Sequence, residues 1–347
     1  MTIVYFIVVL GIIILIHEIG HFTAAKAFKV YCQEFALGFG PTLLKYQGKE
    51  TKYSLRILPF GGYVSMAGDQ GVEIENLPFE RTLKGVNRLK RAIIMLSGIA
   101  MNVLLTWALL SAMFIADPRQ LVSPPPIIDG IVETYPAAVA GVKVGDEVVA
   151  VTFHGQKRKE IRDYFELATL LAGNKETLVL EIKRADQLIN IEVTPIYNEE
   201  NGRYLIGING RQPELRHLSF LQCFSEAGKE LVFYSGEMFK VIGNLLQGQG
   251  LENLSGPLGI AQMTGEQAQA GFINLVFLVA ILSLNVALFN LLPLPILDGG
   301  RVILILIEAL LNKPLNKKFE TALMLLSLLV IGALMFIAFY NDIIRMF

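Results

Sequence analysis

The chain has 347 residues, of which 53% are hydrophobic and 18% are charged, and its net charge at pH 7 is −1. A hydrophobic fraction this high is typical of a membrane protein, and the near-zero charge excludes the basic field that would draw a protein to nucleic acid. The two cysteines, Cys32 and Cys223, match no metal-binding or redox spacing, so we expect both to be unpaired.

Four segments are apolar enough and long enough to cross a bilayer as helices, which takes roughly 20 residues. The sequence predicts a polytopic α-helical membrane protein with transmembrane helices at 1–28, 92–116, 272–300 and 322–347, the apolar part of the third ending near Leu292. The first segment has no basic stretch before it and no small-residue cleavage site, so we expect it to remain in the mature protein.

Basic residues cluster in the stretches beside these spans. The loop 29–91 is rich in Lys and Arg, whereas none precedes the first span. Cytoplasmic flanks are enriched in these residues, so we expect 29–91 and the loop 301–321 to face the cytoplasm. Four crossings then place both termini and the whole of 117–271 on the extracytoplasmic side.

The cytoplasmic loop contains a β-favouring run at 53–66, YSLRILPFGGYVSM. The run is broken by Pro59 and by Gly61 and Gly62, which favour turns. We therefore predict a hairpin or looped strand, a β-loop associated with the membrane.

The outer segment 117–205 has the pattern of an α+β domain. It predicts a strand, a short helix at PAAVAG, a turn at VGD and a second strand, followed by a helix at 164–171 and the strands LVLEIKR and LINIEVTP. Over 127–195 this order resembles a PDZ domain in its circularly permuted bacterial form. The following stretch, 206–271, is an amphipathic connecting region whose helix at 220–246 we expect on the soluble domain or at the membrane surface.

The first span carries the motif His17-Glu18-Ile19-Gly20-His21. Residues four apart share one face of a helix, so both imidazoles can reach one zinc ion while Glu18 stands beside a bound water. Short motifs also arise by accident. Ionisable side chains inside a span are costly, however, which favours a functional role here.

A catalytic zinc site needs a third protein ligand and one open position. Asp298, in the sequence NLLPLPILDGG, lies at the cytoplasmic end of the third span, at the depth of the two histidines. The prolines and glycines around it permit an irregular backbone that could direct the carboxylate inward. The alternative is an acidic residue in an ordinary loop. His154 and His217 are poor candidates, because both belong to the outer segment.

These motifs together resemble the site-2 protease family of intramembrane zinc metalloproteases, peptidase family M50, and in particular its bacterial RseP-like branch. The residues that carry the resemblance are HEIGH in the first span, LDG at the third, SGIAMN at 97–102 and the single outer PDZ-like domain. RseP has two tandem PDZ domains, whereas this chain has room for one.

The resemblance implies that His17, His21 and Asp298 bind Zn²⁺ and that Glu18 is the general base. It also implies that Asn285 and Asn290 lie near the substrate backbone, although amides in spans often serve only to join helices.

The function implied is a zinc metalloendopeptidase of the bacterial inner membrane that cleaves transmembrane segments of single-span proteins, such as anti-sigma factors or remnant signal peptides. Two other classes stay open. A metal transporter would be expected to show internal repeats or more polar residues in its spans, and a non-cleaving PDZ membrane scaffold would not require an intact Glu18.

Overall fold

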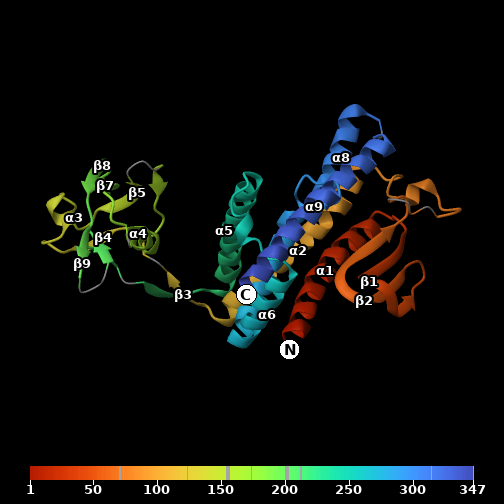
Figure 1. Ribbon diagram of the computed structural model, residues 1–347, viewed down its shortest axis with the longest axis horizontal. Helices are drawn as coiled ribbons and strands as arrows, with labels where there is room; N and C mark the ends of the chain where they lie inside the picture. The colour runs from red at the N-terminus through yellow and green to blue at the C-terminus, as the bar shows by residue number, and fades with distance from the viewer. Residues whose placement is uncertain are drawn as a thin grey trace. The chain divides into compact units, whose positions relative to one another are not determined.

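The computed structural model describes residues 1–69, 72, 74–122, 124–153, 157–172, 174–199, 203–211, 213–313 and 315–346. The chain forms two compact units, one of Met1–Ala116 with Phe220–Phe347 and the other of Asp117–Ser219 (Figure 1).

Four helices in the described part of the first unit are long and apolar enough to cross a membrane, as the sequence predicts. They are α1 (Thr2–Ala27), α2 (Arg88–Ala116), α7 (Phe272–Asn290) and α9 (Lys317–Met346). Helix α2 begins four residues before the expected 92, because its helical backbone continues through the basic stretch 88–91 that flanks the apolar run.

Helix α2 is the centre of this unit and packs against α1, α5, α7 and α8. The contact with α1 is close at Gly20, where a Cβ would lie 2.4 Å from the carbonyl oxygen of Ser97. Small residues let helix backbones approach each other in membrane proteins. Ile94, one turn before Ser97 on α2, is fully buried, so the two helices form a tight pair at this contact.

The predicted third span, 272–300, is not one helix. Helix α7 ends at Asn290, residues 291–297 form a turn, and α8 (Asp298–Leu311) begins at the aspartate. The expected loop 301–321 is therefore largely helical. Pro293 and Pro295 lack the N–H groups that would continue α7, and α8 forms because it buries Leu304 and Ile305 against the bundle.

Two long strands, β1 (Cys32–Gln47) and β2 (Lys52–Met66), follow α1 and lie beside it (Figure 1). The predicted β-loop at 53–66 is thus one strand of a larger sheet. Residues 34–37 of β1 pair with 62–65 on one side and with 52–55 on the other. The sheet is curled by this double pairing, which leaves the segment 62–66 at one edge.

Helix α5 (Phe220–Leu246) forms where the sequence predicts it. It packs on α2 and α7 of its own unit. The indole Nε1 of Trp107 donates to the carbonyl oxygen of Phe224 over 3.1 Å, and the rings of Tyr234 and Phe277 are in contact. We expected this helix on the soluble domain or at the membrane surface, and it packs on two membrane-length helices.

Helix α6 (Pro257–Ala270) packs on α1 and is capped by α9. The buried carboxylate of Asp342 accepts from the backbone N–H groups of Gly256 and Gly259 at 3.0 and 2.9 Å. These donors would otherwise be unpaired at the start of the helix. Short 3₁₀ turns occur at Phe79–Arg81 and Leu251–Asn253.

The second unit contains a four-stranded antiparallel sheet in the order β6-β5-β7-β8. Its core is made by Val148, Leu167, Leu180 and Ile182, all fully buried. Its elements are β3 (Arg119–Val122), β4 (Ile128–Ile131), α3 (Pro136–Val139), β5 (Glu147–Phe153), β6 (Lys159–Glu160), α4 (Tyr164–Leu171), β7 (Leu178–Arg184), β8 (Gln187–Val193), β9 (Ile196–Asn198), β10 (Arg203–Leu205), β11 (Ile208–Gly210) and β12 (Glu214–His217).

Helix α4 and strands β5, β7 and β8 form where the sequence predicts them. The unit ends at Ser219 rather than at the expected 205, because β11 and β12 pair with β4 and β3 near its beginning. The likeness to a PDZ domain stays a prediction from the sequence.

Candidate metal centre

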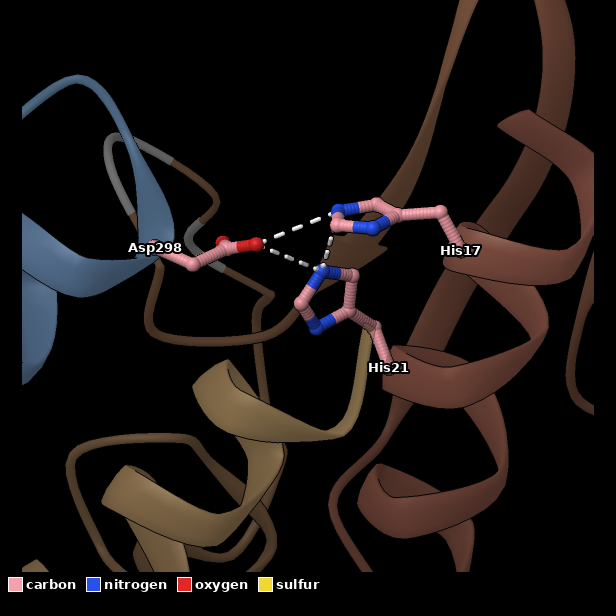
Figure 2. Close-up of side chains that lie close together, drawn as sticks. All are labelled: His17, His21 and Asp298. Carbon is pink, nitrogen blue, oxygen red and sulfur yellow. Dashed lines mark hydrogen bonds and ion pairs between the residues drawn. The ribbon is translucent and has the colours of Figure 1, made fainter. Parts of the chain in front are cut away.

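The two histidines of the H-E-x-x-H motif lie one turn apart on α1 and point to the same place (Figure 2). Both are buried, and their Nε2 atoms are 3.1 Å apart. Helical spacing puts residues i and i+4 on one face, so the local sequence alone explains this pairing.

Asp298 approaches the histidines from α8 (Figure 2). Its Oδ2 lies 3.1 Å from Nε2 of His17 and 3.2 Å from Nε2 of His21. The turn before α8 folds closely onto the start of that helix. A Cβ at Gly299 would lie 2.3 Å from the carbonyl oxygen of Leu291, so only glycine permits this path.

The three side chains fit a divalent metal. Their ligand atoms lie within 4.8 Å of one another. Apart from its close approach to the two imidazoles, Oδ2 of Asp298 is buried without a hydrogen-bond partner in the described part of the chain. A tetrahedral ion with bonds of about 2.0–2.1 Å holds its ligands about 3.3 Å apart, close to the spacing found here. Two imidazoles and one carboxylate are also a donor set of catalytic zinc sites, which keep a fourth position open.

Helix α2 supports both histidines from behind. Nδ1 of His21 lies 2.8 Å from the carbonyl oxygen of Ile94, and Nδ1 of His17 lies 3.4 Å from the side-chain Nδ2 of Asn102. A Cβ at Gly98 would lie 2.4 Å from Nε2 of His21. The motif at 97–102 was identified from the sequence only as a family likeness. Its glycine and asparagine, four residues apart on one helix face, were the signal of a shared contact.

A cavity of 280 Å³ opens at the three side chains. Glu18 lines it and packs against Gly62 of β2, where a Cβ would lie 3.1 Å from Cγ of the glutamate. The other lining residues come from α1, from the edge of the curled sheet and the residues after it, from α2, and from the end of α7 through the turn to the start of α8. They are His17, His21, Gly62, Tyr63, Val64, Met66, Asp69, Met95, Asn290, Ile296, Asp298 and Arg301.

The two predicted asparagines are placed differently. Asn290 lines the cavity, and its Nδ2 donates to the carbonyl oxygen of Val286 over 2.9 Å. Asn285 is partly buried one and a half turns earlier on α7 and is not among the described residues that line the cavity. Of the remaining histidines, His217 lies in β12, and His154 lies outside the described residues.

A second cavity, of 420 Å³, adjoins the first and shares Asp69, Met95 and Arg301 with it. Nη1 of Arg301 donates to Oδ2 of Asp69 over 3.1 Å, so this ion pair lines both cavities. A second ion pair, Arg91 with Glu308 at 2.9 Å, joins α2 to α8 in the wall of the larger one.

The fold and the site together define a protein with membrane-length helices and a centre for a divalent metal, built from an H-E-x-x-H helix and a distant aspartate. The chain belongs to peptidase family M50, whose model matches residues 5–334.

Bacterial proteins are similar to this chain over nearly its whole length. A protein of Clostridium perfringens named "Putative zinc metalloprotease" is 33% identical over 346 residues, which cover 99% of each chain. One of Agrobacterium fabrum with the same description is 30% identical over 366 residues, covering 98% of this chain and 95% of the other. The "Regulator of sigma-W protease RasP" of Bacillus subtilis is 25% identical over 425 residues, covering 100% and 99%.

Proposed function

We propose that this chain is a zinc metalloendopeptidase that hydrolyses a peptide bond within a transmembrane segment of single-span membrane proteins. The observation that carries the proposal is the convergence of His17, His21 and Asp298 beside Glu18 in one cavity. The names of the relatives, zinc metalloproteases and a protease that regulates a sigma factor, support it.

His17, His21 and Asp298 would hold the zinc ion. When bound, zinc supplies Lewis-acid polarisation of the scissile carbonyl and lowers the pKa of water to about 7. Glu18 accepts a proton from the attacking water and passes it to the leaving amine. Asn290, which lines the same cavity, or Asn285, five residues earlier on α7, orients the backbone of the substrate.

The curled sheet offers a way to hold the substrate extended. A helical segment must unwind before its carbonyl can be attacked, because helix hydrogen bonds and side chains cover the backbone. The edge segment 62–66 pairs with β1 on one side, and four of its residues line the cavity. An unwound substrate can add to this edge by main-chain hydrogen bonds.

The proposal includes the membrane setting. We place the chain in the bacterial inner membrane, with 29–91 in the cytoplasm and both termini and the second unit outside, as the distribution of Lys and Arg indicates. The PDZ-like unit would then bind exposed chain ends or exclude substrates with large outer domains. Anti-sigma factors and remnant signal peptides both fit this arrangement.

Replacement of Glu18 by Gln tests the proposal. We expect cleavage of a single-span model substrate by the purified chain in detergent to fall by about 10²–10⁴-fold, the usual contribution of a general base. The substitution Glu237→Gln, on the exposed surface of α5, is the control and leaves cleavage unchanged. Cleavage by Glu18→Gln at the wild-type rate would contradict the assignment, and a transporter or scaffold would cleave in neither form.

A further inference from the structure

We propose that Asn102 is a positioning residue: it accepts a hydrogen bond from Nδ1 of His17 and so fixes the imidazole tautomer whose Nε2 faces Asp298. This role rests on the proposed zinc site and concerns a residue on a helix that contributes no ligand.

The contact itself is buried. Asn102 is 0% exposed, its Nδ2 lies 3.4 Å from Nδ1 of His17, and its Oδ1 has no hydrogen-bond partner among the described residues. A neutral imidazole that binds a metal through Nε2 carries its proton on Nδ1 and donates it. With the amide NH₂ directed at His17, two hydrogen-bond donors would face each other and no hydrogen bond could form. Rotating the side-chain amide by half a turn exchanges Nδ2 and Oδ1. Oδ1 then faces Nδ1 of His17 and accepts its hydrogen bond.

The neighbouring histidine shows the same requirement met by the backbone. Nδ1 of His21 lies 2.8 Å from the carbonyl oxygen of Ile94, a group that can only accept. Both imidazoles thus need an acceptor behind them, and α2 supplies both. Only the acceptor of His17 is a side chain, so only that one can be removed by substitution.

Asn102 is held in place by two further helix contacts. Its backbone carbonyl oxygen accepts from the hydroxyl groups of Thr106 and Ser283, each at 3.0 Å. Both hydroxyl residues are fully buried, and Ser283 lies on α7. The position of the amide relative to His17 is therefore fixed by the packing of α1, α2 and α7.

The test is the affinity of the purified full chain for zinc, measured in detergent by competition with a chromophoric chelator. Asn102→Asp keeps an acceptor, Asn102→Leu keeps the volume without one, and Ser111→Ala removes a buried hydroxyl elsewhere on α2. We expect Asn102→Leu to bind zinc about 10–100-fold more weakly, as for other groups that orient metal-binding histidines. Asn102→Asp and Ser111→Ala should stay near the wild-type affinity.

The order of zinc affinities among the variants distinguishes a positioning role of Asn102 from a role in packing alone. A residue that only fills space would tolerate Leu and be disrupted by a buried carboxylate. The proposal would therefore be overturned if Asn102→Leu bound zinc with wild-type affinity. It would also be overturned if Asn102→Asp bound zinc as weakly as Asn102→Leu. If the Leu variant does not fold, Asn102→Ala replaces it, with the same expected order. A wild-type chain that binds no zinc would overturn the proposed function itself, together with this role.

Discussion

Gly98 lies where the two histidine rings meet α2. A Cβ at this position would lie 2.4 Å from Nε2 of His21 and 2.8 Å from Cε1 of His17, in a buried site whose rings are confined by other contacts. Glycine here allows the imidazoles to occupy the space beside the helix. The residue therefore contributes to the centre by having no side chain.

We predict that Gly98→Ala displaces the rings and weakens both zinc binding and cleavage. Overpacking of a confined site costs about 1–3 kcal/mol, which is roughly a 5- to 150-fold loss of affinity. Gly11→Ala is a matched control, because a Cβ there meets nothing within 4 Å and alanine favours the helix. Competition with a chelator measures both variants, and equal affinity of Gly98→Ala and Gly11→Ala would exclude the steric role.

At this scale the sequence predicts the residues whose geometry is local. The spacing of His17 and His21 places both on one face of a helix, whatever the rest of the chain does. The support from Gly98 and Asn102 depends on how α1 packs on α2, which no spacing within one helix can reveal. Asn285, which the family resemblance places near the substrate, is not among the described residues that line the cavity, and its role stays a prediction.

Among the elements, the curled sheet contains a half-buried carboxylate that joins several of its residues. Glu34 of β1 accepts hydrogen bonds from Ser54, Arg56 and Tyr63 and an ion pair from Lys52. Burial raises the pKa of Glu34, but these donors outweigh it and lower the pKa to about 2. Tyr63 also lines the cavity at the metal centre, so the cluster connects the sheet to that site.

We predict that Glu34→Gln lowers the stability of the sheet against local unfolding by about 1.5–3 kcal/mol, the usual contribution of hydrogen bonds to a charged group. The effect should appear as faster hydrogen exchange in β2 and a higher KM for a transmembrane substrate. Because the folded-state pKa lies below the ordinary value of roughly 4.3, the stabilisation is fully present above that pH and is lost as the pH falls through about 2.

The matched control is Glu50→Gln. Glu50 pairs with Lys26 and Arg81, but its side chain is 43% exposed, and exposed ion pairs contribute little. The cluster around Glu34 does not stabilise the sheet if the two variants show the same hydrogen exchange rates in β2. The same conclusion follows if Glu34→Gln leaves these rates unchanged.

The turn between α7 and α8 shows where prediction of elements fails. Pro293 and Pro295 indicate a break, but they do not say whether a helix resumes afterwards. It resumes at Asp298 because the apolar residues of α8 are buried against α2, a contact between segments about 200 positions apart in the chain. Strands β11 and β12 were missed for a similar reason, since each is short and pairs with a distant strand.

For the whole molecule, the four membrane-length helices follow from hydropathy alone, because a bilayer selects for about 20 apolar residues in a row. Which helices touch does not follow from hydropathy. The packing of the chain decides that α2 is central, that α5 lies against it and that one ion pair lines both cavities. The three candidate metal ligands could be predicted because their spacing and their depth in the spans are visible in the sequence.

The central claim is that two segments far apart in the chain, α1 and the start of α8, hold one zinc ion between them. The zinc content of the purified chain in detergent, compared between wild type, Glu18→Gln and Asp298→Ala, tests this directly. We predict one tightly bound zinc ion per chain in wild type and in Glu18→Gln, and the loss of most of it in Asp298→Ala, because a site with two histidines alone lacks its third ligand. Retention of wild-type zinc content and affinity by Asp298→Ala would contradict the account.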